Sequence, residues 1–323
     1  MFQKYARHFH EEIPTRPSGK YAHLVVLRHT DSYGVFKTDG ELNTALVAAG
    51  ISDTKPMTRV TIFKRKQSTA ERLTGRELLR RHGVIGNNCR YNEAFCGECP
   101  DCILYGYAIG DTGSEKSKVY TDTCYSVTSY DESHETFTLN APFEDGTMTR
   151  GDQTTNRFSE QDHVVPGVFF PSVVTLRDPT PEGLAYVINN IRRTKLYGAQ
   201  TSRTGHMANE VLAMIFADGE IFSNLRLTQG VYDWLRNSAK YQTPLQEAEV
   251  RKATLAVAEE LVKRDGVSYD FVSGEALEAL LEEVEGAVTD DEHLGSFLKA
   301  LGADTASYAK RAAESEDKKK GKA

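Results

Sequence analysis

Four cysteines within fourteen residues constrain this chain more than any other feature of its sequence. Cys89, Cys96, Cys99 and Cys102 form the pattern C-x6-C-x2-C-x2-C. Such spacing is typical of a tetrahedral zinc site, because four sulfur ligands close the coordination shell and leave no position for water or substrate. We therefore predict a structural zinc ion that folds residues 84–105, a loop with little hydrophobic core of its own.

Two other interpretations of these cysteines stay open. An iron–sulfur cluster also uses four cysteines, but the fourth cysteine and the proline of the ferredoxin signature do not follow Cys102. The third interpretation is four thiols without a ligand. Cys124 stands apart from the cluster, and we expect it to be a small buried residue in a strand.

The charges of the chain are segregated. The net charge of its 323 residues is -7, yet residues 55–90 hold ten basic and two acidic side chains. Residues 186–206 hold four basic side chains and no acidic one, whereas residues 244–295 hold fourteen acidic and four basic ones. Basic segments poor in acidic residues are typical of phosphate-binding surfaces, although a charge run can also be a solvated face.

The sequence predicts neither a membrane span nor export. It contains no run of about eighteen apolar residues, the minimum for a spanning helix. Its first sixteen residues lack the apolar centre of a signal peptide. We therefore expect a cytoplasmic protein with reduced thiols.

Hydrophobic patterning predicts a mixed α+β protein. We expect extended segments at residues 22–28, 59–63, 103–109, 118–129, 135–140 and 164–176, and a strand pair at 211–216 and 220–227 around Asp218-Gly219. Helices are predicted at residues 69–82 and 181–197, and residues 140–163 read as a long hairpin or flexible insertion. The order β-α-β-β-α-β favours a ferredoxin-like, or RRM-like, core with large insertions.

Three regions follow from these patterns. Residues 1–240 are expected to hold the RRM-like core. Residues 241–313 form an acidic helical lobe, because their leucines and valines recur at helical spacing. Residues 314–323 form a charged, lysine-rich tail that we expect to be disordered.

Several segments, in a fixed order, resemble a known family. They are ERLTGRELLRRHG at 71–83, CILYGYAIGD directly after the cysteine pair, the strand SKVYTD at 117–122, DQTTNRF at 152–158, VVPGVFF at 164–170 and RTKLYGAQTSRTG at 193–205. Together they resemble the RAMP-type backbone subunits of CRISPR effectors, the antiviral defence complexes. The combination over residues 22–227 is most similar to the type I-D backbone family, the "Cas seven" type also called Csc-two.

This resemblance implies a function without catalysis. Several copies would pack side by side along one CRISPR RNA, and a β-hairpin thumb at residues 140–163 would push out nucleotides at regular intervals. Guide bases would stay exposed to pair with target DNA or RNA, so base pairing would read the sequence. The implied partners are CRISPR RNA, the target, other copies of the chain and other effector subunits.

Basic and glycine-rich segments are the expected RNA contacts. Arg72, Arg76 and Arg80 are spaced by four on the first predicted helix and form one basic stripe that can neutralise phosphates. Glycines in GAQTSRTG let the backbone approach a phosphate, and Phe158 of the thumb can wedge between bases. The full set is Arg28, Lys64, Arg65, Lys66, Arg72, Arg76, Arg150, Asn156, Arg157, Phe158, Gly198, Gln200, Thr201, Ser202, Arg203, Thr204 and Gly205.

Two alternatives to this function stay open. Related type III backbone subunits use an aspartate in the loop after the first strand to cut RNA, so a metal-dependent ribonuclease using Asp31 or Asp39 is the enzyme alternative. An unrelated zinc-stabilised module that binds RNA or protein is the other. The chain has no H-E-x-x-H, G-x-S-x-G or Walker motif, and we expect it not to be an enzyme.

Overall fold

The computed structural model describes residues 1–109, 113–138, 143–144, 149–150, 153–154, 160–198 and 202–320. Helices and strands alternate along the chain and pack into shared cores, so the predicted α+β class is confirmed. None of the helices in these ranges combines the length and apolar character that a membrane crossing requires.

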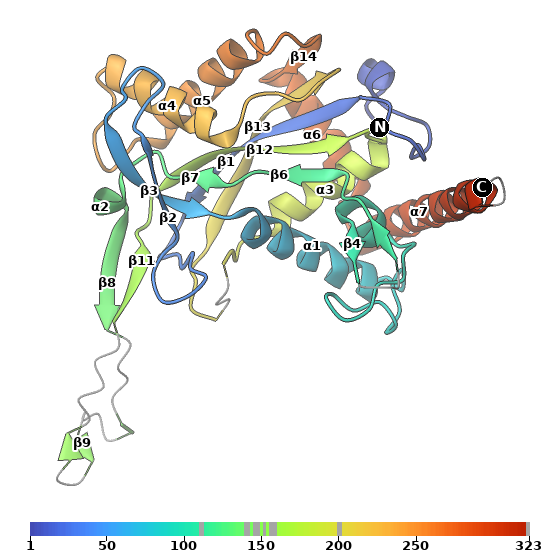
Figure 1. The fold of residues 1–323 in the computed structure, drawn as a ribbon, viewed down its shortest axis with the longest axis horizontal. Helices are drawn as coiled ribbons and strands as arrows, with labels where there is room; N and C mark the ends of the chain where they lie inside the picture. The colour runs from blue at the N-terminus through green and yellow to red at the C-terminus, as the bar shows by residue number, and fades with distance from the viewer. Residues whose placement is uncertain are drawn as a thin grey trace.

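A five-stranded antiparallel sheet forms the centre of the molecule (Figure 1). In spatial order its strands are β14 (Tyr269–Val272), β13 (Met207–Ala217), β1 (Tyr21–Thr30), β12 (Phe169–Arg177) and β6 (Val119–Thr121). The predicted strand at residues 22–28 is confirmed as β1, which is buried at every residue except His29. The continuous apolar run at residues 24–27 therefore reflects burial on both faces of the sheet.

Helices cover both faces of this sheet. They are α1 (Lys64–Arg81) and α3 (Pro181–Arg193) on one side, and α4 (Asn224–Asn237) and α5 (Glu247–Val262) on the other. Alternate residues of β1 serve the two cores, because successive side chains of a strand point to opposite faces. Leu24 and Val26 pack in the first core, and Val25 and Leu27 in the second.

A glycine lets α1 and α3 approach closely. A Cβ atom on Gly75 would lie 2.4 Å from Tyr186 Oη and 2.5 Å from Asn190 Nδ2. Gly75 weakens the helical pattern of the sequence, yet it is the residue that permits this packing.

Smaller sheets surround the central one. One holds β2 (Thr44–Ala48), β3 (Pro56–Ile62) and β7 (Cys124–Tyr125); others pair β4 (Tyr107–Ala108) with β5 (Ser114–Glu115) and β9 (Thr149–Arg150) with β10 (Gln153–Thr154). After the short helix α2 (Tyr130–Ser133), β8 (His134–Thr138) pairs antiparallel with β11 (Glu160–Val164). This pair leaves the body of the molecule as a hairpin base, where the sequence predicts the insertion (Figure 1).

Two predicted elements are wrong. The segment 103–109 is not a strand; a π-helical turn (Asp101–Tyr105) and the short β4 replace it, because this stretch wraps around the cysteines. Residues 220–227 do not return as a strand. The chain instead enters α4, whose first turn is capped when Ser223 Oγ accepts a hydrogen bond from Arg226 N.

The acidic helical segment shares the cores of the rest of the chain. Its strand β14 pairs with β13 in the central sheet. Helices α6 (Glu275–Ala287) and α7 (Asp291–Lys320) place Leu280 and Leu298 in the same core as Leu24. Helix α7 continues to Lys320, so most of the tail predicted as disordered is helical.

Candidate metal site and nucleic-acid interface

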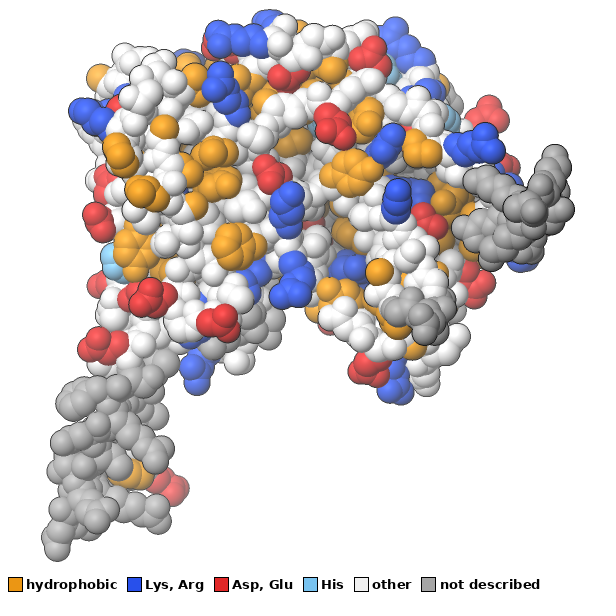
Figure 2. Space-filling view, in the orientation of Figure 1, with side chains coloured by type: hydrophobic (Ala, Val, Ile, Leu, Met, Phe, Trp, Pro, Cys, Tyr) orange, Lys and Arg blue, Asp and Glu red, His pale blue; other side chains and the backbone are white. Residues whose placement is uncertain are grey.

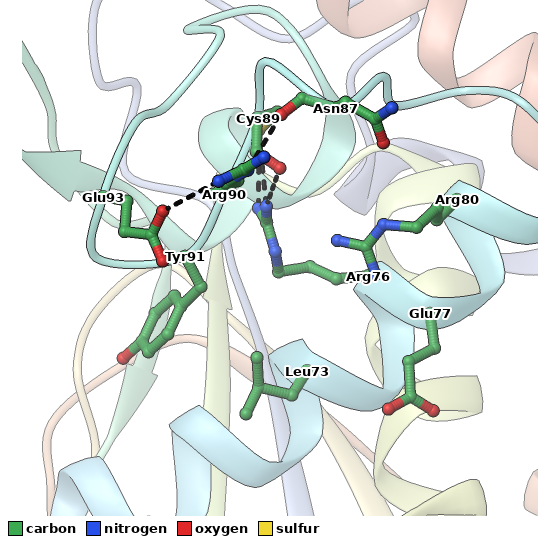
Figure 3. A pocket seen from close by; sticks show the side chains of 9 residues that line it. All are labelled: Leu73, Arg76, Glu77, Arg80, Asn87, Cys89, Arg90, Tyr91 and Glu93. Carbon is green, nitrogen blue, oxygen red and sulfur yellow. Dashed lines mark hydrogen bonds and ion pairs between the residues drawn. The ribbon is translucent and has the colours of Figure 1, made fainter.

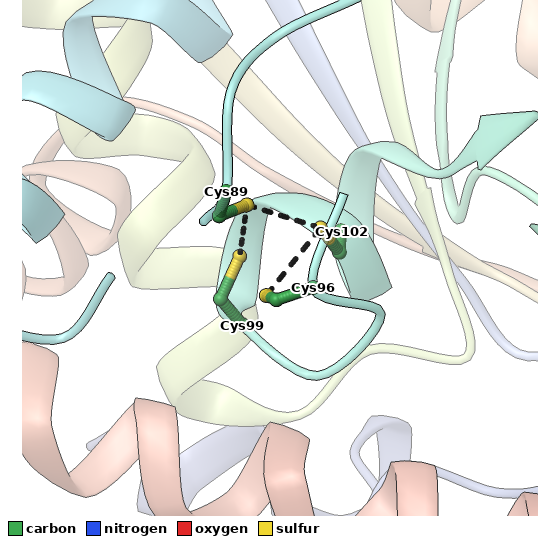
Figure 4. A group of neighbouring side chains, drawn as sticks. All are labelled: Cys89, Cys96, Cys99 and Cys102. Atoms are coloured by element: carbon green, nitrogen blue, oxygen red, sulfur yellow. Dashed lines mark hydrogen bonds between the residues drawn. The ribbon is translucent and has the colours of Figure 1, made fainter. Parts of the chain in front are cut away.

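The four clustered cysteines converge on one point (Figure 4). Cys89 Sγ lies 3.9 Å from Cys99 Sγ and 3.8 Å from Cys102 Sγ, and Cys96 Sγ lies 3.9 Å from Cys102 Sγ. All four sulfurs are within 4.8 Å of one another. Four sulfurs at about 2.3 Å from a tetrahedral metal ion are separated by about 3.8 Å. The donor set therefore fits one metal ion.

The same distances discriminate against other states of the cysteines. A disulfide would bring two sulfurs to about 2.05 Å, and all four cysteines are free. An iron–sulfur cluster spreads its thiolates over separate iron atoms, which keeps them farther apart.

A buried carboxylate, Asp101, joins the cysteine loop to α1. Arg72 donates from Nε and Nη2 to its two oxygens, both at 2.9 Å, and Arg76 donates from Nη1 at 2.6 Å. Asp101 is 0% exposed, Arg72 9% and Arg76 1%. The expectation that Arg72 and Arg76 lie on an RNA-facing stripe is therefore corrected, since the loop covers both. Arg80, the third member, is exposed.

Arg28 is also removed from the surface. Its guanidinium donates to Glu71 Oε1 at 2.7 Å, to Tyr197 Oη at 2.9 Å and to Asn209 Oδ1 at 2.8 Å. The side chains of Arg28 and Glu71 are both 0% exposed. Arg28 therefore ties β1 to α1 and cannot reach a phosphate.

A cleft of ≈ 700 Å³ runs between α1 and the chain that follows α3. Its lining combines four cationic side chains with one acidic one and two half-exposed leucines. The lining residues are Arg65, Lys66, Thr69, Ala70, Leu73, Thr74, Glu77, Arg193, Thr194, Lys195, Leu196, Gly198 and His206. In Figure 2 the lower edge of the molecule is notched, and Lys and Arg side chains gather around this notch.

The cations of this cleft are available to an anion. Among the residues that the structure describes, no carboxylate forms an ion pair with Arg65, Lys66 or Lys195. Burial and the neighbouring Arg65 lower the pKa of Lys66, and Asp39 acts in the opposite direction. Lys64 differs from them, because its Nζ lies 3.6 Å from Asp122 Oδ1.

The glycine-rich loop packs mainly against the loop after β1. A Cβ atom on Gly198 would lie 2.3 Å from Val35 O, and one on Gly205 would lie 2.1 Å from Ser32 Oγ. Thr204 is buried, and its Oγ1 accepts a hydrogen bond from Val35 N at 3.0 Å. These three residues thus serve close packing, whereas Ser202 and Arg203 are exposed. Gln200 and Thr201 lie outside the described residues.

The thumb predicted at residues 140–163 is described only in part. Its base is the β8–β11 pair, and Arg150 belongs to β9. Asn156, Arg157 and Phe158 lie outside the described residues.

Comparison with known proteins identifies the family. The model of the Csc2 CRISPR family matches residues 8–298. The chain belongs to the Csc2 CRISPR family. The resemblance found over residues 22–227 is therefore confirmed. No curated protein sequence matches the chain.

Solved structures share the fold of this Csc2 family member. The crystal structure of Thermofilum pendens Csc2 has 16% sequence identity and a TM-score of 0.66, over 98% of this chain and 96% of that one. A chain described as "CRISPR RNA-guided surveillance complex, pre-nicking" has 10% identity and a TM-score of 0.52, over 88% and 99%. At such identities the likeness is one of fold.

The two aspartates of the enzyme alternative lie in the loop after β1 and are exposed. Asp31 Oδ1 is 3.0 Å from His29 Nε2. Within the described ranges, the only group of three or more His, Cys, Asp or Glu ligand atoms is the cysteine cluster. Neither Asp31 nor Asp39 therefore belongs to a metal-ligand cluster in the described part of this family member.

Three basic residues of the cleft were not among the RNA contacts predicted from the sequence: Arg193, Lys195 and His206. Arg193 and Lys195 fall in the acid-free basic segment at 186–206, so their charge pattern was a usable signal. No comparable charge pattern marks His206 in the sequence. It reaches the cleft because its backbone N donates to Ser32 Oγ at 2.8 Å.

Proposed function

We propose that this Csc2 family member is the non-catalytic, RNA-cradling backbone subunit of a type I-D CRISPR effector complex. The observation that carries this proposal is the cleft beside α1, where Arg65, Lys66, Arg193 and Lys195 face a single carboxylate, that of Glu77. Flexible cations along an open cleft neutralise phosphates without reading bases. Exposed Leu73 and Leu196 offer apolar contact to sugars or bases.

The sheet order supports an RRM-like core for this role. The chain order is β1, α1, β6, β12, α3 and β13, and the spatial order of the strands is β13-β1-β12-β6. We assign these elements to the β-α-β-β-α-β ferredoxin-like arrangement. Both helices then lie on one face, and the cleft forms where α1 meets the end of α3.

In the proposed complex, copies of the chain line up along one CRISPR RNA, and the hairpin that starts at β8 and β11 serves as the thumb. The guide bases stay free to pair with target DNA or RNA. The cysteine cluster holds a zinc ion that folds its loop, with no open position for substrate. Other effector subunits complete the assembly.

Charge removal in the cleft tests RNA binding. We expect Lys66→Ala combined with Lys195→Ala to weaken binding to RNAs of unrelated sequence by similar factors. The slope of log affinity against log salt should fall by roughly 1.4, because each lost contact with single-stranded nucleic acid removes about 0.7. Fluorescence anisotropy over a salt series measures both quantities.

Lys252→Ala is the matched control for this experiment. Lys252 is exposed on α5, which covers the opposite face of the sheet. Its loss should leave the salt slope unchanged. If the double variant also keeps the slope of the unmodified chain, RNA does not occupy the cleft.

The backbone role predicts a specific assembly. Native mass spectrometry of the chain with RNAs of increasing length should give a ladder in which copies are added at a constant RNA increment. A fixed stoichiometry of one or two copies at every length would contradict the backbone role and favour an isolated RNA-binding module.

A further inference from the structure

One feature links the metal site to the cleft: the flank of α1 beneath the cysteine loop. Asp101 lies in the loop between Cys99 and Cys102, so metal coordination places its carboxylate. Arg72 and Arg76, from successive turns of α1, both donate to this carboxylate. Asp101 is thus the shared counter-charge of two buried guanidiniums.

Arg76 also contacts a cysteine directly (Figure 3). Its Nη2 donates to Cys89 O at 2.7 Å, and Nη1 and Nη2 lie 3.6 and 3.5 Å from Cys89 Sγ. Four thiolates around a divalent cation carry an excess of negative charge, and N–H groups directed at a ligand sulfur offset it and orient the ligand. Arg76 therefore serves the metal site and α1 at once.

The outward face of the same helix lines the cleft. Lys66, Thr69 and Leu73 face Arg193 and Lys195 across it. The relative position of these groups depends on where α1 lies against the rest of the protein. The start of the helix is held independently, because Gln67 Nε2 donates to Ile62 O and Asp122 O at 2.8 and 2.9 Å. The loop with Asp101 instead holds the second half.

We propose that Asp101 and Arg76 are positioning residues that couple the metal site to the cleft: metal in the four-cysteine site seats α1 and thereby raises RNA affinity. The RNA part of this inference rests on the proposed function. When the metal leaves, the crowded thiolates separate and Asp101 moves with them. Two guanidiniums then lose their buried counter-charge, which is unfavourable, and the helix flank opens to water.

The first experiment uses the unmodified chain. Its metal is removed with a chelator, and amide hydrogen exchange is compared before and after. We expect faster exchange in α1 from Arg72 to Arg81 and little change around Gln67. RNA affinity should fall measurably, because Leu73 and Thr74, which line the cleft, lie in the half of α1 that loosens, while the start of the helix around Gln67 keeps its place. Readdition of zinc should restore both properties.

The second experiment compares matched variants. Asp101→Asn keeps the shape of the side chain but removes its charge, and we expect it to release metal to a colorimetric chelator about ten- to a hundredfold faster. Arg76→Lys keeps a charge but not the fork of donors, so its rate should be intermediate. Arg80→Gln is the control: Arg80 is exposed on α1, one turn from Arg76, and its release rate should equal that of the unmodified chain.

The outcomes separate this inference from the proposed function. Unchanged exchange in α1 after metal removal, or equal release rates for Asp101→Asn and Arg80→Gln, would overturn the coupling. If neither the unmodified chain nor any variant binds RNA, the proposed function is overturned. Amide hydrogen exchange in α1 and the rates of metal release would then still show whether the metal site positions α1. If Asp101→Asn does not fold, the chelation experiment on the unmodified chain decides it.

Discussion

Replacing Glu71 with leucine is expected to lower the free energy of unfolding by about 3–5 kcal/mol. Glu71 Oε1 accepts hydrogen bonds from Arg28 Nη2 at 2.7 Å and from Tyr197 Oη at 3.1 Å. All three side chains are fully buried. Burial opposes the charge of Arg28, but Tyr197 and Glu71 outweigh it and raise its pKa. Without Glu71 an uncompensated cation would remain in the core. Urea denaturation measures the loss.

A double variant provides the control for this buried pair. Arg28→Met with Glu71→Leu removes both charges and should regain most of the lost stability, because an apolar pair of similar volume can replace a buried ion pair. The exposed pair of Glu259 on α5 and Lys263 directly after this helix, 2.9 Å apart, offers a second control. Glu259→Leu should change stability little. A Glu71→Leu variant as stable as the unmodified chain would show that the buried pair is dispensable.

Loss of one cysteine ligand should have the second large effect. The purified chain is expected to hold about one zinc ion, and Cys99→Ser should reduce this to a small fraction. The free energy of unfolding should fall by about 3 kcal/mol or more, because binding of a structural metal contributes directly to folding. Elemental analysis and thermal unfolding, with and without chelator, measure the two effects. Acidification should also release the metal, since the ligands must be deprotonated.

Cys124 is the matched control for the metal site. It is buried but outside the cluster, and its Sγ donates to Gln67 Oε1 at 3.0 Å. A serine can keep this hydrogen bond, so Cys124→Ser should leave the metal content unchanged. If elemental analysis finds no metal in the unmodified chain, the zinc assignment is wrong. If it finds iron instead of zinc, the cysteines bind iron.

Local patterns predicted the elements whose residues interact within a short stretch of chain. The apolar run at 22–28 became β1, and the helical spacing at 181–197 became α3, which ends slightly earlier at Arg193. The strand predicted at 220–227 failed because Asp218-Gly219 suits any tight turn. A serine cap after it, with an apolar face for the second core, favoured α4.

A site residue could be predicted from the sequence only where a charged side chain also lies at the surface in the folded structure. Lys66 was selected for its basic segment and does line the cleft. Arg28 belongs to the apolar run of β1, and its charge alone could not indicate that Glu71 would neutralise it. The sequence predicts Gly198 and Gly205 in a phosphate-binding loop, but it does not reveal that Val35 and Ser32 lie against them. Gly198 also lines the cleft.

By itself, the sequence determined the family, the α+β class and the convergence of the cysteines, since four ligands within fourteen residues need only local turns to meet. Only the tertiary structure decided which basic residues face solvent. Helical spacing puts Arg72 and Arg76 on one stripe, but whether that stripe is open or covered depends on Asp101, which a separate loop delivers. A buried charge needs a partner, and the partner comes from packing that spacing along one helix does not encode.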